Sequence, residues 1–176
     1  MSIPHVPEPC RLIVSVLTAQ KEVADSALPG LTRELGPLEN EIGPLAFDFT
    51  TYYDEELGTG VRRWLWVFSD LRDRGELARI KCLTNEVEQS YTVGGKRRFN
   101  LDPGAMSLEN FILATGKNRA HRIYLQDGIF AELTLIFQGI SYRPVESTFP
   151  DYRDPEMIDT LNKLREIYKC KLRGIP

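Results

Sequence analysis

The stretch Leu12–Thr18, LIVSVLT, is short, rich in β-branched residues and almost continuously apolar. A run of this length and composition is typical of a strand that is buried on both faces. The segment after it has a helical spacing of apolar residues, namely Val23, Ala24, Ala27, Leu28, Leu31 and Leu35. The two segments together predict a buried strand that leads into a helix packed against a sheet.

Further elements of the same kind follow before residue 102. Alternating apolar residues predict strands over residues 45–50 and residues 62–69, and Asp48 then faces away from the neighbouring phenylalanines. Asp73 is a suitable cap for a helix, and residues 96–101 return as a strand. The resulting order of strand, helix, strand, strand, helix and strand is that of ferredoxin-like folds.

The second half of the chain extends this core. A turn at residues 102–104 precedes a short apolar helix predicted over residues 107–114. Asp127-Gly128, between two alternating runs, predicts the tight turn of a β-hairpin over residues 120–138, and Pro155 opens a final helix. We therefore expect an α+β fold: a ferredoxin-like βαββαβ core with a mostly antiparallel sheet, extended by a short helix, a β-hairpin and a C-terminal helix.

The length and composition indicate one globular domain. The chain has 176 residues, and we expect a proline-rich leader over residues 1–10 and a single α+β domain over residues 11–176. No apolar run approaches the roughly 20 residues of a membrane span, and the start of the chain lacks a secretory signal. The three cysteines form no C-x-x-C pair, which disfavours a disulfide framework or a thiolate zinc site. These features predict a cytoplasmic protein without a membrane partner.

The charge distribution points to one class of ligand. The net charge is −3, yet residues 91–122 carry six Lys and Arg residues against two acidic residues. Extended nucleic-acid binding needs many phosphate contacts, so an acidic chain with one basic segment is a poor candidate for it. A small anionic ligand, such as a nucleotide or a phosphorylated metabolite, fits better.

Basic residues on two separate segments are the candidate contacts for such an anion. Arginine offers a planar set of donors that matches carboxylate or phosphate. The predicted anion contacts are Arg97, Lys117, Arg119, His121 and Arg122, and Tyr124 or Tyr152 could stack on the ligand. A solvated basic edge that protects a strand from aggregation is the alternative interpretation.

A catalytic function is a second hypothesis. If Asp127-Gly128 forms a two-residue turn, His121 and Glu132 share one face of the hairpin as diagonal neighbours. A carboxylate beside an imidazole suits a general acid/base, so the pair could serve phosphoester hydrolysis or transfer. Asp48 or Asp102 could then recruit Mg²⁺ or Mn²⁺. The simpler interpretation of the pair is a cross-strand hydrogen bond, and two histidines cannot build a standard zinc site.

A third hypothesis is an interaction protein that docks through its C-terminal helix. The apolar stripe of that helix includes Leu161, Leu164 and Tyr168. A docking function requires these side chains to be exposed in the isolated protein.

Five segments of the chain resemble the signatures of a known family. They are FDFTTYYDEELGTG (47–60), FNLDPGAMSL (99–108), LATGKNRAHRIYL (113–125), DGIFAELTL (127–135) and FPDYR (149–153). In this order and at this spacing they resemble an uncharacterised bacterial family, domain of unknown function 4416. The resemblance implies a small cytosolic bacterial protein. It implies no activity, cofactor or catalytic residue, so the residue roles above rest on the sequence pattern alone.

Overall fold

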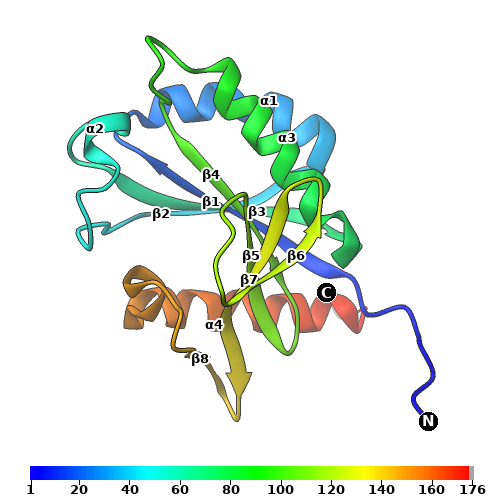
Figure 1. The fold of residues 1–176 in the computed structure, drawn as a ribbon. Helices are drawn as coiled ribbons and strands as arrows, with labels where there is room; N and C mark the ends of the chain where they lie inside the picture. The colour runs from blue at the N-terminus through cyan, green and yellow to red at the C-terminus, as the bar shows by residue number, and fades with distance from the viewer. Residues whose placement is uncertain (175–176) are drawn as a thin grey trace.

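An antiparallel sheet of eight strands forms the centre of the computed structural model, which describes residues 1–174 (Figure 1). The strands are β1 (Cys10–Thr18), β2 (Leu38–Leu45), β3 (Arg62–Arg72), β4 (Asn100–Met106), β5 (Asn110–Thr115), β6 (Arg122–Gln126), β7 (Ile129–Gln138) and β8 (Ser141–Pro144). The helices are α1 (Lys21–Leu35), α2 (Asp54–Leu57), α3 (Leu77–Ser90) and α4 (Pro155–Leu172), with short 3-10 helices η1 (Arg74–Glu76) and η2 (Pro150–Arg153). The predicted α+β class is confirmed.

The order of the strands places the first half of the chain at one side of the sheet. It runs β2-β3-β1-β4-β5-β7-β6, with β8 also paired to β7. The element order from β1 to β4 is the predicted one, since α1 connects β1 to β2 and α3 connects β3 to β4. The more specific likeness to ferredoxin-like folds stays a prediction.

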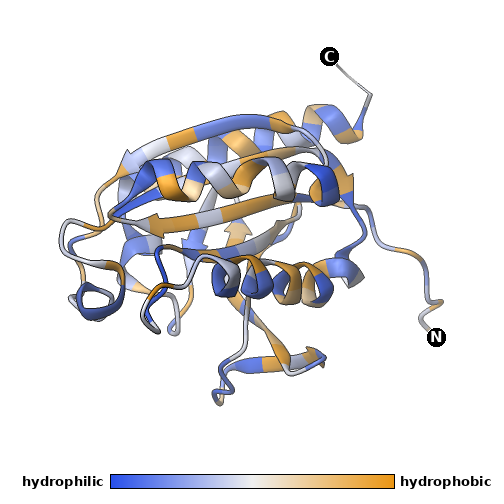
Figure 2. Ribbon diagram, turned by 90° about the horizontal axis from the view of Figure 1, so that it is seen from above, coloured by the Kyte–Doolittle hydropathy of each residue, from blue (hydrophilic) through white to orange (hydrophobic). Residues whose placement is uncertain are grey.

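The two faces of the sheet are covered by different helices, α1 and α3 on one face and α4 on the other (Figure 1). Val14 and Val16 of β1 pack with Leu31 of α1, whereas Ile13 belongs to the core shared with Leu161 of α4. Figure 2 shows hydrophobic residues, in orange, along the strands that lie between the helix layers. The continuous apolar run of β1 therefore has a simple cause, because both of its faces are buried.

The strand predicted over residues 45–50 is wrong in position. β2 lies earlier, at Leu38–Leu45, and pairs with β3 as an edge strand. Phe47 is instead buried in a small cluster with Leu17 and Leu57, at the end of the sheet. The alternation of residues 45–50 therefore belongs to a loop that is anchored by Phe47, and this pattern resembles a half-buried strand in sequence.

The turn predicted at residues 102–104 and the short helix predicted over residues 107–114 are also wrong. β4 continues to Met106, and residues 110–115 form β5, its hairpin partner. Pairing with β5 begins only at Gly104, so Pro103 lies where β4 has no partner on that side and its missing N–H costs no ladder bond. Ser107 closes the hairpin turn, because its backbone N–H donates to the Asn110 carbonyl at 2.9 Å.

The predicted hairpin of β6 and β7 is confirmed, but its register differs by one residue. Asp127 and Gly128 adopt the left-handed region, with φ of 53° and 75°. A register shift between Tyr124 and Gln126 then places Arg122, and not Ile123, opposite Glu132. A bulge adds one residue to a strand and moves the side chains beyond it to the opposite face. The predicted assignment of side chains to the two faces of the hairpin is therefore wrong.

Candidate functional site

A cleft of about 490 Å³ opens on the α4 side of the sheet. Its walls come from the loop after β2, the segment between β5 and β6, and the segment that includes η2. Residues from β1, β3, β4 and β5 complete the lining. The aromatic residues in the lining are Phe47, Phe49, Tyr52, Tyr53, Phe149 and Tyr152. Segments that are far apart in the chain therefore meet at one concave surface.

The segment between β5 and β6 supplies a basic wall. Lys117, Arg119 and His121 of this segment line the cleft, together with Arg122, the first residue of β6. Arg122 holds this segment together, because its NH1 group donates to the Lys117 carbonyl at 2.7 Å. The Lys117 ammonium lies 3.3 Å from the Tyr52 hydroxyl and 4.9 Å from the centre of the Tyr52 ring. The basic wall and the aromatic loop after β2 are thus in contact.

Arg63 of β3 lies at the floor of the cleft, and its side chain is only 4% exposed. One terminal nitrogen, NH1, donates to Ser15 Oγ at 2.6 Å and to the Tyr152 hydroxyl at 2.8 Å. The other forms an ion pair with Asp151. The Phe47 and Tyr152 rings lie 5.1 and 4.8 Å from the guanidinium. Among the described residues, the buried Nε–H of Arg63 has no hydrogen-bond acceptor.

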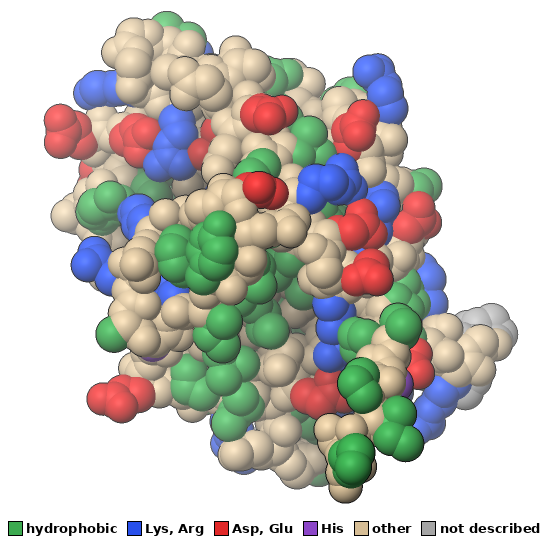
Figure 3. Space-filling view, turned by 45° about the vertical axis from the view of Figure 1, so that its right-hand side comes forward, with side chains coloured by type: hydrophobic (Ala, Val, Ile, Leu, Met, Phe, Trp, Pro, Cys, Tyr) green, Lys and Arg blue, Asp and Glu red, His purple; other side chains and the backbone are tan. Residues whose placement is uncertain are grey.

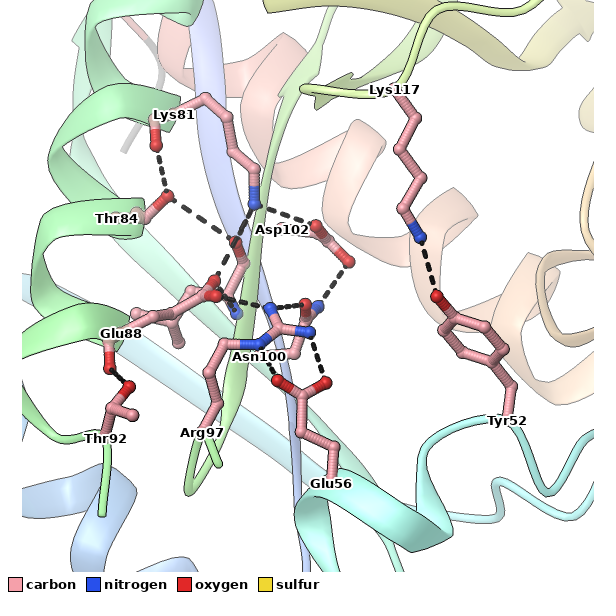
Figure 4. A network of polar contacts seen from close by, with 11 residues as sticks. Tyr52, Glu56, Lys81, Thr84, Glu88, Thr92, Arg97, Asn100, Asp102 and Lys117 are labelled. Carbon is pink, nitrogen blue, oxygen red and sulfur yellow. Dashed lines mark hydrogen bonds and ion pairs between the residues drawn. The ribbon is translucent and has the colours of Figure 1, made fainter. Parts of the chain in front are cut away.

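Asp102 of β4 is the second charged group in the floor, and Figure 4 shows its partners. Lys81 Nζ donates to Oδ1 at 3.0 Å, and Asn100 Nδ2 donates to Oδ2 at 2.6 Å. Burial opposes ionisation of this carboxyl, but the Lys81 ammonium and these two hydrogen bonds outweigh it. The pKa of Asp102 is therefore held below its usual range, and the group is a carboxylate at neutral pH.

Arg97 does not line the cleft, so the structure does not bring it together with the other predicted anion contacts. Its Nε and NH2 groups donate to the two carboxylate oxygens of Glu56 at 2.6 and 2.8 Å (Figure 4). Its NH1 group donates to Glu88 at 2.5 Å, and Glu88 is buried. Burial raises the pKa of Glu88 although Lys81 and Arg97 oppose the shift. Arg97 is thus a structural cation that ties α2 and α3 to the start of β4.

The two predicted stacking tyrosines have different positions. Tyr124 is 60% exposed, packs edge-on against Phe130 and does not line the cleft, so the structure does not bring it together with the predicted anion contacts. Tyr152 lines the cleft, but it is 2% exposed and its hydroxyl is held by Arg63. Burial raises the pKa of Tyr152 to about 12, so the hydroxyl stays protonated at neutral pH. The exposed rings at the cleft are those of Phe49, Tyr52 and Phe149.

His121 and Glu132 lie near each other, although not in the predicted way. The distance from His121 Nε2 to Glu132 Oε2 is 3.7 Å, longer than a hydrogen bond. Arg122 Nε donates to the same oxygen at 2.6 Å, and both of these side chains are buried. His121 lines the cleft and is 41% exposed. The Glu132 carboxylate is therefore hydrogen-bonded to Arg122, and the His121 imidazole lies beyond hydrogen-bond distance of it.

The acidic residues considered for a metal do not converge. Asp48 is exposed and lies 3.8 Å from Arg62, whereas Asp102 lies in the floor of the cleft. Over residues 1–174, no group of three or more His, Cys, Asp and Glu side chains has the arrangement of a metal site. Asp102 and Asp151 both line the cleft, but each already has a cationic partner.

The apolar stripe of α4 is covered by its own sheet. Leu161, Leu164 and Tyr168 are all buried in the core shared with β1, β3 and β5. The docking hypothesis required these side chains to be exposed, so it loses the surface on which it depended.

The sequence pattern missed part of the site. Arg63, Asp151, Phe49 and Phe149 were not among the predicted residues, although all four line the cleft. One signal was present for Arg63, since a charged residue in a strand that is covered on both faces needs a buried partner. No local signal identified Asp151, because its role depends on the packing of η2 against β3.

The charged surface is mixed on the face that Figure 3 draws. Lys and Arg side chains alternate there with Asp and Glu side chains, and hydrophobic side chains gather near the middle. Extended nucleic-acid binding uses a continuous basic face. The expectation that this protein lacks such binding stays a prediction.

The fold and the cleft together define a class: an α+β domain with an antiparallel sheet and a cleft that is lined by aromatic and charged side chains. The model of the family described as "Domain of unknown function (DUF4416)" matches residues 8–168, and the chain belongs to this family. The predicted family is thereby confirmed. No curated protein and no solved structure matches the chain. Within residues 1–174, no helix is long and apolar enough to cross a membrane.

Proposed function

We propose that this protein binds a small anionic ligand, a nucleotide or a phosphorylated metabolite, in the cleft beside β4 and β5. The observation that carries the proposal is the convergence of Lys117, Arg119, His121 and Arg122 on one concave surface. A cavity of several hundred Å³ with a few polar groups is typical of small-molecule sites. We also propose that the protein is bacterial and acts in the cytoplasm, as the family resemblance implies.

The balance of charge supports an anion. Arg122 is neutralised by Glu132, and Arg63 is neutralised by Asp151. Lys117 and Arg119 line the cleft, and neither has a carboxylate within 4 Å in the part of the chain that is described. Two cations that are not neutralised by a carboxylate of the described residues create a positive potential in a partly enclosed cleft, and this potential attracts anions.

The aromatic rings support a ligand with an apolar or planar portion. Phe49, Tyr52 and Phe149 line the cleft and are exposed. Exposed aromatic side chains around a cleft are favourable contact surfaces because they lose water on binding. A ligand that is an anion at one end and can pack on rings at the other suits both features.

Thermal stability measured with added inorganic phosphate or adenosine monophosphate tests the proposal. A ligand that binds only the folded protein raises Tm, and Lys117→Ala combined with Arg119→Ala should remove that increase. Lys163→Ala is a matched control, because Lys163 is a well-exposed cation on α4. If neither anion changes the Tm of the unmodified protein, the proposal fails.

Phosphoester hydrolysis or transfer is a second candidate, favoured by one observation: His121 lines the cleft and lies 3.7 Å from Glu132. Arg119 and Lys117 would hold the phosphate while His121 exchanges a proton. Turnover of p-nitrophenyl phosphate with Mg²⁺ or Mn²⁺ tests it, and His121→Ala should abolish the rate without loss of Tm. A rate that is unchanged in this variant would remove His121 from the mechanism.

A further inference from the structure

The floor of the cleft has hydrogen-bonding capacity that the protein itself leaves unused. Each oxygen of Asp102 accepts one hydrogen bond, from Lys81 or from Asn100. A carboxylate oxygen accepts two, so both oxygens have capacity left. The Asp102 side chain is 29% exposed and lines the cleft. The remaining acceptor sites are therefore accessible to a ligand.

Arg63 is the other charged group of the floor, and its side chain is only 4% exposed. Both residues are linked to Ser15 of β1, which pairs with Asp102 across the sheet and accepts a hydrogen bond from Arg63. The Nε atom of Arg63 is buried, so a ligand in the cleft does not reach it. Of these two charged groups, Asp102 is therefore the one that can contact a ligand.

The carboxylate of Asp102 selects for a hydroxyl. A hydroxyl is a neutral donor, and the charge of Asp102 is already balanced by the Lys81 ammonium. A phosphate placed at the floor would be repelled by the Asp102 carboxylate, and a ligand ammonium would be repelled by Lys81 and Arg63. The phosphate must then lie at the basic wall of Lys117 and Arg119, away from the floor.

We propose that the ligand is a sugar phosphate, free or as part of a nucleotide, with its phosphate at Lys117 and Arg119 and a sugar hydroxyl at Asp102. This inference rests on the proposed function, since it specifies the class of anion. The rings of Phe49, Tyr52 and Phe149 provide packing for the sugar or for an attached base.

Calorimetric titration of the full chain with four probes tests the inference: inorganic phosphate, ethyl phosphate, ribose 5-phosphate and adenosine monophosphate. Ribose 5-phosphate should bind at least about tenfold more tightly than ethyl phosphate, as expected for a hydrogen bond to a charged group. Asp102→Asn should reduce this preference to less than about threefold. Loss of a negative charge cannot weaken the attraction for ethyl phosphate, so the effect should be confined to the sugar. Asp159→Asn, on an exposed carboxylate of α4, is the matched control.

Each outcome separates the two proposals. Equal affinity of the unmodified protein for ethyl phosphate and ribose 5-phosphate overturns the sugar inference and leaves the anion site intact. If none of the four probes binds, the proposed function itself is overturned. Because the comparison of probes needs no variant, it remains decisive if Asp102→Asn fails to fold. Tighter binding of adenosine monophosphate than of ribose 5-phosphate identifies a nucleotide, and the reverse order identifies a free sugar phosphate.

Discussion

Arg122 on β6 lies directly opposite Glu132 on β7, and its Nε donates a hydrogen bond to Glu132 Oε2 at 2.6 Å. The side chains are 5% and 2% exposed. This pair joins the hairpin to the cleft, because Arg122 also donates to the Lys117 carbonyl and so fixes the basic wall. A buried ion pair of this kind is sensitive to removal of either partner, since the remaining charge is left uncompensated.

Arg122→Ala or Glu132→Ala should each lower the free energy of unfolding by about 3–5 kcal/mol. The double variant should lose less than the sum of the two, because the residues interact directly. Urea denaturation measures all three values. Lys163→Ala, which breaks an exposed pair with Asp159, should change stability by no more than about 0.5 kcal/mol. A loss below about 1 kcal/mol for both single variants would contradict the burial of this pair.

Arg97→Ala should destabilise the protein without weakening anion binding. The substitution leaves the buried carboxylate of Glu88 with fewer partners and releases Glu56 of α2. Arg97 is partly exposed, so we expect a moderate loss of about 1–3 kcal/mol in denaturant unfolding. Phosphate affinity, measured by titration, should stay within a factor of about two, because Arg97 lies outside the cleft. A tenfold loss of affinity in a folded Arg97→Ala variant would return this residue to the binding site.

The ionisation of Asp102 predicts a loss of stability in acid. Its pKa in the folded protein lies below the unfolded value of about 3.9. The stabilisation is therefore fully present above about pH 4 and is lost as the pH falls through the lower pKa of the folded state. Unfolding free energies measured from pH 7 to pH 3 should show the difference between the unmodified protein and Asp102→Asn shrink at the acid end. A difference that grows toward acid would reverse the sign of the assigned shift.

Gly104→Ala should be destabilising for a steric reason. A Cβ atom at this position would lie 2.5 Å from Phe111 Cζ, inside the core between β4 and β5. Overpacking of a core typically costs about 1–3 kcal/mol. Gly116→Ala is the matched control, because a Cβ there meets nothing within 4 Å and needs no unusual backbone angle. Thermal unfolding should therefore show a lower Tm for the first variant and little change for the second.

Leu161→Ala on α4 tests whether the apolar stripe of this helix belongs to the core. The side chain is fully buried, so its truncation should lower stability by about 2–5 kcal/mol. Ile167, on the same helix, is half exposed, and Ile167→Ala should cost much less. Similar small effects of both substitutions in chemical denaturation would revive the hypothesis of a docking face.

The sequence predicted those parts of the fold whose signals are local. The buried strand β1 follows from its continuous apolar run, the tight turn of β6 and β7 follows from Asp127-Gly128, and the start of α4 follows from Asp154 and Pro155. Each signal depends on the conformational preferences of a few neighbouring residues. The family could also be read from the chain itself, because its motifs are strings of adjacent residues.

The predictions that failed required knowledge of distant partners. Whether residues 107–114 form a helix or the hairpin partner of β4 depends on the strand beside them, and the sequence of this segment suits both. The bulge near Leu125 shifts the register by one residue, so that Arg122 lies opposite Glu132. Arg97 lies in the same basic segment as Lys117, but α2 and α3 supply the carboxylates that bind it.

The amino-acid sequence by itself determined the α+β class, the family and the basic segment between Lys117 and Arg122, because patterns of adjacent residues carry all three. Only the tertiary structure decided which charged side chains form ion pairs and which do not. Ion pairing needs side chains within about 4 Å of each other, and contacts between Arg63 and Asp151 or between Lys81 and Asp102 join residues that are far apart in the chain. Folding neutralises some of the basic residues and leaves Lys117 and Arg119 at the cleft.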